Sequence, residues 1–278
     1  MLYAVLSQRF KTHKTQGNLN NELGVPLTLL SMPEDTEAAV IEMGISDFGE
    51  MTRLSEMVQP TICVLTIIGE CHLENLGDRD GVLKAKTEMF KNACENADFI
   101  LNGDDDKLST VKTVNGKKPV FFGLDAKNDF YAKNIKNSGD GKVLATLCFD
   151  NNNIDVEIPA IGTYMVTNAL AAAAAGKLLG LTDEEIANGV ASYKTVGSRA
   201  NVINTGKIKI IDDCYNANPT SVRASLDTLS NLDGRKVAIL GDMKELGSEE
   251  LKLHFDTGVY AKSKDIGTVI TVGELAKE

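Results

Sequence analysis

Short apolar runs alternate along the chain with segments that carry a helical pattern. The strand-like runs are residues 38–44, 61–68, 98–104 and 119–124. Between them, residues 49–59 and 81–97 repeat apolar positions every three or four residues, as amphipathic helices do. Strands that alternate with helices are typical of parallel sheets, because each parallel connection needs a crossover. The pattern therefore predicts an α/β fold with a mainly parallel central sheet flanked by helices.

Residues 128–161 follow a different pattern. Polar and apolar residues alternate over short stretches, and the turn signals NSGDG and DNNN separate them. We expect a small added antiparallel region here. Two helices should follow: residues 168–180, which end at Gly180, and residues 182–193, which Thr182 caps with Glu185 three positions on.

The strand and helix alternation restarts near residue 200. The new segments are residues 207–215, 219–232, 236–243, 248–263 and 268–273. We therefore predict two domains, residues 1–199 and residues 200–278. The second holds too few predicted strands for a complete doubly wound domain, which makes it a partial Rossmann-like α/β domain. Residues 1–10 read as a helix with no strand before it, so both ends of the chain look cut.

Composition narrows the class of protein. The net charge of −10 argues against a basic nucleic-acid footprint, and no apolar run reaches the length of a membrane span. Without a signal-peptide pattern, we expect a cytoplasmic location. The five cysteines are an odd number without CxxC spacing, which favours buried free thiols over disulfides or a zinc site.

Polar groups follow three successive predicted strands. Glu42, His72, and Asn102 with Asp104 and Asp105 stand where these strands end. Parallel strands bring their carboxyl ends to one edge, where ligands of α/β proteins bind. Taken singly, each has an ordinary interpretation as a loop carboxylate, a helix cap or a structural histidine. Their convergence favours a site.

Six stretches together resemble the Mur ligase family: TQGNLNNELG, AVIEMG, LTIIGECHLENLG, AKTE, DDCYNANPTS and GDMKELG. The resemblance is greatest to members that join D-alanyl-D-alanine to UDP-N-acetylmuramoyl-tripeptide in peptidoglycan biosynthesis. It implies an ATP-dependent ligation through an acyl phosphate, with Mg²⁺ as cofactor and those two molecules as substrates. It also implies that residues 1–199 are the ATP-binding central domain and residues 200–278 a partial C-terminal domain.

The resemblance assigns Glu42 and His72 to magnesium and Lys86 to a lysine that carries a carbamate. A carboxylate suits Mg²⁺, whereas imidazole is a less usual ligand. A neutral lysine amine can take up CO2 and become an anion, and burial or nearby cations make that neutral form accessible. Without the resemblance, Lys86 would be interpreted as a solvated helix lysine.

Further positions follow from the resemblance. The implied nucleotide-binding residues are Asn168, Arg199, Asp213, Tyr215, Asn216 and Asn218. The implied substrate-binding residues are Thr15, Asn18, Asn20 and Asn21. Gly162 to Met165 depart from the family's G-x-H-N before the adenine-reading asparagine. From the residues alone, YNANP would be interpreted as a turn and a helix cap, with Pro219 as the first residue of the helix. The side-chain amides of TQGNLNN would be interpreted as turn caps.

No GxxxxGK[ST] phosphate loop occurs in the sequence. The resemblance thus describes a fragment without the N-terminal domain, the phosphate loop and the end of the C-terminal domain, with little or no ligase activity. The missing strand should leave a gap or an exposed sheet edge, through which the chain could self-associate. Two alternatives stay open: another substrate, as in other Mur ligases or folylpolyglutamate synthase, or a catalytically silent nucleotide-binding or assembly piece.

Overall fold

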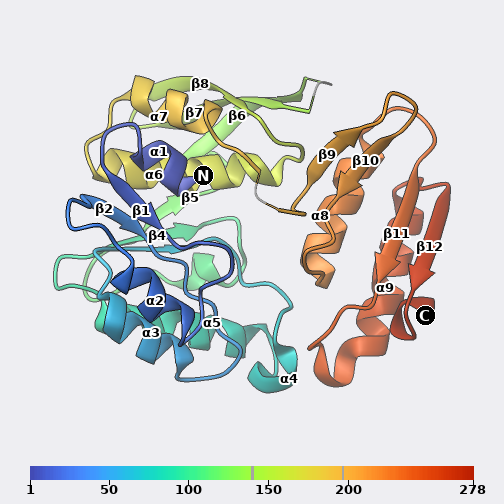
Figure 1. Cartoon of the computed structure of the whole chain (residues 1–278), viewed down its shortest axis with the longest axis horizontal. Helices are drawn as coiled ribbons and strands as arrows, with labels where there is room; N and C mark the ends of the chain where they lie inside the picture. Colours follow the sequence, from blue (N-terminus) through green and yellow to red (C-terminus); the bar gives the residue numbers. More distant parts are fainter. Residues whose placement is uncertain (139–140, 196) are drawn as a thin grey trace.

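The computed structural model describes residues 1–138, 141–195 and 197–278 (Figure 1). Its helices are α1 (Leu2–Leu6), α2 (Gly24–Leu30), α3 (Glu50–Val58), α4 (Leu73–Leu76), α5 (Arg79–Thr87), α6 (Tyr164–Leu178), α7 (Asp183–Ala191), α8 (Pro219–Ser230) and α9 (Glu250–Ser263). Its strands are β1 (Thr12–Lys14), β2 (Ala38–Val40), β3 (Ile62–Leu65), β4 (Asp98–Asn102), β5 (Val120–Phe122), β6 (Tyr131–Asn137), β7 (Val143–Phe149), β8 (Asn152–Ile158), β9 (Asn201–Asn204), β10 (Lys209–Asp212), β11 (Val237–Gly241) and β12 (Thr268–Val272). We call residues 1–199 the first unit and residues 200–278 the second unit, following the boundary that the sequence predicts.

The predicted α/β class is confirmed, and the predicted parallel ladders are present. Strand β4 pairs in parallel with β3 on one side and with β5 on the other. Strand β2 pairs in parallel with β1, which the apolar pattern did not predict. Within the described ranges no ladder joins β2 to β3, so the parallel strands form two sheets and each of these strands keeps an unpaired edge.

The sheet of β3, β4 and β5 is buried on both faces, as a parallel sheet requires. Ile100 on β4 packs into one core with α1 and α6, while its neighbours Phe99 and Leu101 pack into another with α3 and α5. The alternation follows from the two-residue period of a strand. Helix α6 covers one face closely because its inward positions are alanines, several of them fully buried.

The predicted antiparallel region is confirmed: β7 pairs antiparallel with both β6 and β8. The NSGDG turn signal includes residues 139–140, which lie outside the described residues. In the second unit, β11 pairs in parallel with β12, and β10 pairs antiparallel with β9. The sequence pattern missed β9 because its residues carry no apolar run between clear turn signals.

Predicted helix ends are confirmed where side chains cap them. Thr182 and Glu185 form a capping box at α7, and Asn218 with Pro219 begins α8. The α-helix predicted at 81–97 ends earlier, at Thr87, and a 3-10 turn, Glu88–Asn92, follows it. The Glu88 carboxylate there accepts from the Thr52 hydroxyl at 2.8 Å and so binds this turn to α3.

The cysteine prediction is confirmed in part. All five thiols are free, and Cys63 and Cys148 are buried. Burial raises the pKa of Cys63 to about 12, so this thiol stays protonated and unreactive at neutral pH. Cys214, in contrast, is exposed, because it lies in the loop after β10.

Two helical glycines provide a matched test of the packing between α1 and α7. A Cβ at Gly189 would lie 2.4 Å from Val5 Cα, whereas a Cβ at Gly258 in α9 meets nothing within 4 Å. We expect Gly189→Ala to lower the free energy of unfolding by about 1–3 kcal/mol, because α1 must move. Gly258→Ala should raise it by up to about 1 kcal/mol through helix propensity. Urea unfolding measures both, and equal stabilisation by the two alanines would contradict the close packing.

Candidate functional site

The loop of residues 66–72, which follows β3, is held in place by side chains at the end of β4. The Thr66 carbonyl accepts a hydrogen bond from Asn102 Nδ2 at 2.9 Å, and the Ile68 amide donates to the Asp105 carboxylate at 2.9 Å. Asp105 is 7 % exposed and also accepts from the amides of Lys107 and Leu108. Asn102 and Asp105, predicted as site groups, therefore shape the neighbouring loop.

Helix α5 contributes two more contacts to the same loop. Arg79 Nε donates to the Ile68 carbonyl at 2.8 Å, and its guanidinium pairs with Asp106, which lowers the pKa of that carboxyl. Lys86 Nζ donates to the Ile67 carbonyl at 3.1 Å. Lys86 is thus half-buried and attached to the loop that ends at His72, which differs from a freely solvated helix lysine.

His72 stands at the beginning of α4 in a left-handed backbone conformation, with φ 54°. Its side chain is 30 % exposed, and its Nδ1 atom is in ion-pair contact with the Glu245 carboxylate of the second unit. Nδ1 forms no hydrogen bond within the described residues. The imidazole therefore lies where the two units meet.

Glu42 follows β2 and is exposed. Its Oε1 accepts from Asn20 Nδ2 at 2.9 Å, and its backbone amide donates to the Thr15 hydroxyl at 2.9 Å. Asn21 accepts from the Gly24 amide at 2.9 Å at the beginning of α2, and the Asn18 carbonyl accepts from the Asn20 amide at 2.7 Å. The asparagines predicted to bind substrate thus shape the segment between β1 and α2, and Asn20 joins that segment to Glu42.

Three side chains were predicted to hold magnesium, and the structure joins two of them to one loop. Lys86 bonds to loop 66–72 and His72 ends it. In the described part of the chain no hydrogen bond or ion pair links Glu42 to either, and no three His, Cys, Asp or Glu side chains gather as a metal site. The three positions remain a prediction.

An unpredicted residue, Glu70, lies in the same loop. Its Oε2 atom is buried without a hydrogen-bond partner in the described residues, as is the Nδ1 atom of His72 two positions on. A buried carboxylate oxygen without a partner is costly, and a cation would satisfy it. The donor types in this loop therefore fit a divalent cation. The position of Glu70 two residues before His72 was the only hint of this group in the sequence.

The predicted nucleotide residues of the second unit gather around its first loop, together with Arg199 at the end of the first unit. The Arg199 guanidinium lies over the Tyr215 ring, 4.4 Å from its centre, and the Tyr215 amide donates to the Ser198 carbonyl. Asp213 accepts from the Ala200 amide at 2.9 Å and from the Ser225 hydroxyl. Asn216 accepts from the following amide, and Asn218 caps α8. Val196, inside the VGSR stretch, lies outside the described residues.

Asn168, the predicted adenine reader, lies on α6. Its Nδ2 contacts the Met165 sulfur at 3.5 Å within the helix. Tyr164, at the beginning of α6, is close enough to the second unit to interact electrostatically with Asp213. Burial, and to a lesser degree Asp213 and Tyr193, raise the pKa of the Tyr164 hydroxyl to about 12.

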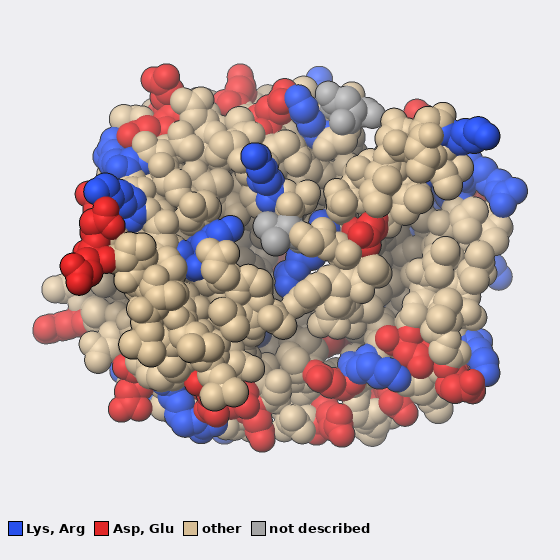
Figure 2. Space-filling view, viewed as in Figure 1, with Lys and Arg blue, Asp and Glu red and all other residues tan. Residues whose placement is uncertain are grey.

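The space-filling view shows a hollow between the two units with basic and acidic side chains on its rim (Figure 2).

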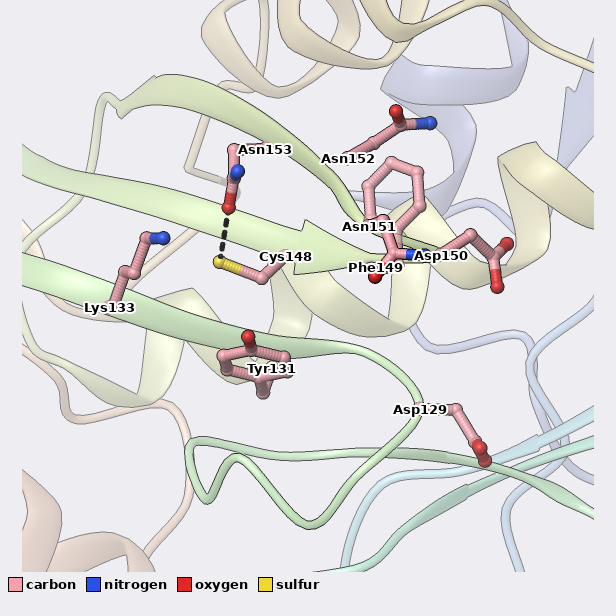
Figure 3. A pocket seen from close by; sticks show the side chains of 9 residues that line it. All are labelled: Asp129, Tyr131, Lys133, Cys148, Phe149, Asp150, Asn151, Asn152 and Asn153. Carbon is pink, nitrogen blue, oxygen red and sulfur yellow. Dashed lines mark hydrogen bonds between the residues drawn. The ribbon is translucent and has the colours of Figure 1, made fainter.

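A separate depression lies on the antiparallel region. It has a volume of about 440 Å³, and polar residues of β6, β7 and the turn after β7 line much of it (Figure 3). Cys148 Sγ bonds to Asn153 Oδ1 at 3.1 Å across its wall. None of the predicted site residues lines it, so it is not the site described above.

Two family models match the chain. The Mur ligase middle domain matches residues 1–176, and the Mur ligase, glutamate ligase domain, matches residues 198–278. This chain belongs to the Mur ligase family.

This Mur ligase chain has relatives that include UDP-N-acetylmuramoyl-tripeptide–D-alanyl-D-alanine ligases. It is 38 % identical over 278 residues to the UDP-N-acetylmuramoyl-tripeptide–D-alanyl-D-alanine ligase of Bacillus subtilis, covering 99 % of this chain and 60 % of that protein. A crystal structure of MurF from Acinetobacter baumannii superposes with a TM-score of 0.95 at 32 % identity, over 99 % of this chain and 60 % of that one. MurF ligase from Thermotoga maritima in complex with ADP gives 0.90 at 29 % identity, over 99 % and 64 %. The chain thus spans about 60 % of the B. subtilis ligase.

Asp213 provides a test of the first loop of the second unit. Its carboxylate is the acceptor for the amide of the buried Ala200, so Asp213→Ala leaves that amide unpaired. We expect amide hydrogen exchange in β9 and β10 to quicken about 5- to 150-fold, the equivalent of about 1–3 kcal/mol. Asp213→Asn keeps a side-chain acceptor and should therefore increase the exchange rate less than Asp213→Ala does. Asp233→Ala, at an exposed position, is the control, and unchanged exchange in Asp213→Ala would refute the assigned contact.

Proposed function

We propose that this chain carries the central and C-terminal part of an ATP-dependent ligase that joins D-alanyl-D-alanine to UDP-N-acetylmuramoyl-tripeptide. One observation supports it most: Lys86 on α5 bonds to the loop of residues 66–72 that ends at His72, and the buried Asp105 holds this loop at the end of β4. The chain that has this geometry matches ligases of that name over 99 % of its length. The substrates and the cofactors ATP and Mg²⁺ are inferred for this chain from that similarity.

The proposed reaction has two steps. A carboxylate oxygen of the tripeptide attacks the γ-phosphorus of ATP, the bond to the ADP oxygen breaks, and an acyl phosphate forms. The amine of D-alanyl-D-alanine then attacks the acyl carbon, phosphate leaves, and the nitrogen loses a proton. Magnesium supplies neutralisation of the phosphate charge in such reactions.

Glu42, His72 and Lys86 would hold that cation. As an ammonium, Lys86 would repel it. The neutral Lys86 amine instead attacks CO2, a C–N bond forms, and the loss of one proton leaves an anionic carbamate. The carbamate nitrogen keeps one N–H, which can still donate to the Ile67 carbonyl, the acceptor of the hydrogen bond from Lys86 Nζ in this structure. The modification therefore changes the charge without giving up the contact with the loop.

The remaining assignments concern binding. Arg199 offers a guanidinium fork for phosphate oxygens, with Tyr215 supporting its plane. Asp213, Asn216 and Asn218 would shape the loop next to the nucleotide, and Asn168 would contact the adenine. Thr15, Asn18, Asn20 and Asn21 would face the nucleotide-sugar substrate.

Location and self-association also remain proposals. None of the described helices is long and apolar enough to cross a bilayer. We expect the chain to work in the cytoplasm, where its proposed nucleotide substrates are made. The unpaired edges of β2 and β3 offer a surface for self-association.

A carbamate on Lys86 can be tested without any ligase assay. In the presence of ¹³C-bicarbonate and Mg²⁺ at about pH 8, we expect one carbamate carbon signal, lost in Lys86→Ala. Lys84→Ala is the matched control, since Lys84 lies on the same helix but is exposed, with its Nζ over the Phe48 ring. A signal that survives in Lys86→Ala, or none in the unaltered chain, would remove the carbamate.

The substrate can be tested in a chimera. Residues 1–278 replace the matching part of the Escherichia coli ligase, which is 37 % identical over 277 residues. We expect ADP release that depends on both UDP-N-acetylmuramoyl-tripeptide and D-alanyl-D-alanine, with His72→Ala lowering it at least 100-fold because a metal ligand is lost. Turnover with glutamate and a folate acceptor instead would favour the folylpolyglutamate synthase alternative. A folded chimera that binds nucleotide without turnover would favour the silent-piece alternative.

A further inference from the structure

The segment of residues 243–247 in the second unit reaches across to the start of α4. The Glu245 carboxylate contacts His72 Nδ1, and the Glu245 carbonyl accepts from the Glu74 amide at 3.4 Å. Met243 and Leu246 are buried, and the half-buried Leu73 packs against them. In Figure 1, α4 lies on the side of the first unit that faces the second.

This segment is held in shape before it meets the first unit. The Met243 amide donates to His254 Nε2 at 2.9 Å, while His254 Nδ1 donates to the Glu250 carbonyl at 2.7 Å. His254 is therefore neutral, with its proton on Nδ1. Just before the segment, Asp242 accepts from the Leu275 and Ala276 amides at 3.0 and 2.9 Å.

A left-handed turn then presents the Glu245 side chain. Glu245 and Gly247 both have φ near 62°. A Cβ at Gly247 would lie 3.2 Å from Glu74 Cα, so the turn touches the backbone of α4. A non-glycine residue in this conformation is uncommon and persists where its surroundings fix it. Glu245 meets His72, which has a left-handed backbone of its own.

We propose that Glu245 is a positioning residue for His72, so that docking of the second unit fixes which imidazole nitrogen can bind a cation. With its proton on Nδ1, the imidazole can donate to the Glu245 carboxylate that Nδ1 already contacts. The lone pair is then left on Nε2, the nitrogen offered to a divalent cation. A carboxylate behind a metal-binding histidine fixes ring and tautomer in this way. The inference rests on the proposed function for its cation, but the tautomer itself does not.

The chain has three histidines, His13, His72 and His254, which makes imidazole NMR a direct test. With ¹⁵N-histidine at about pH 8, we expect His72 to show the Nδ1–H tautomer. In Glu245→Ala it should shift to the Nε2–H form, which an unconstrained imidazole favours. His13→Gln and His72→Gln assign the signals.

Two controls accompany this variant. Glu74→Ala removes an exposed carboxylate of α4 that forms no ion pair within the described residues, and should leave all three imidazoles unchanged. His254 should keep its Nδ1–H signature in Glu245→Ala if the segment stays folded. If that signature is lost, Glu245→Asn replaces the alanine variant, since asparagine suits a left-handed backbone and its shorter side chain withdraws from His72. An unchanged His72 tautomer in the variant that stays folded would overturn the proposal.

Adding Mn²⁺ alone separates this inference from the proposed function. We expect the paramagnetic ion to broaden the His72 ring signals, and about 10- to 100-fold more Mn²⁺ to be needed in Glu245→Ala. Broadening of His72 at equal Mn²⁺ concentrations in both chains would overturn the link to cation binding. No broadening in the unaltered chain would reject the metal site of the proposed function. A tautomer shift seen in that case would still support Glu245 as the group that positions His72.

Discussion

The candidate site depends on the buried contact between Asp105 and the Ile68 amide. Burying a carboxylate costs several kcal/mol, and this cost is offset only because three backbone amides donate to Asp105 and Arg79 lies 3.8 Å away. The same contact fixes the course of loop 66–72. The end of β4 therefore decides where the Ile67 carbonyl meets Lys86 and where His72 begins α4.

The second unit completes this site from the other side. It contributes Glu245 to His72 and Tyr215 to Arg199 through polar contacts. An apolar cluster around Met243 and Leu246, against which Leu73 of the first unit packs, lies beside them. Units joined by modest, polar interfaces move relative to one another as a rule. Because the Glu245 carboxylate contacts His72 across the boundary of the two units, the proposed role of His72 would depend on such motion.

Local signals in the sequence predicted what local physics decides. Alternating apolar runs predicted the parallel ladders of β3, β4 and β5, and the Thr182 and Glu185 pair predicted a helix start. Strand β1, three residues without an apolar run, forms only because β2 pairs with it. The roles of Asn102 and Asp105 were likewise beyond prediction. Whether a polar group at a strand end binds a ligand or a neighbouring loop depends on long-range contacts.

The charge of Lys86 decides whether a cation can share this loop. Two unit charges about 4 Å apart interact by about 4 kcal/mol at the effective dielectric constant of a protein surface. An ammonium beside a divalent cation would thus be opposed by several kcal/mol, and a carbamate favoured by as much. The Ile67 carbonyl accepts equally from an ammonium or from a carbamate N–H, so the loop does not select between them. The Oε2 atom of Glu70 in the same loop is buried without a hydrogen-bond partner in the described residues, which favours a cation in this loop over a second anion. If Lys86 carries the proposed carbamate, that anion and a bound cation would each favour the other.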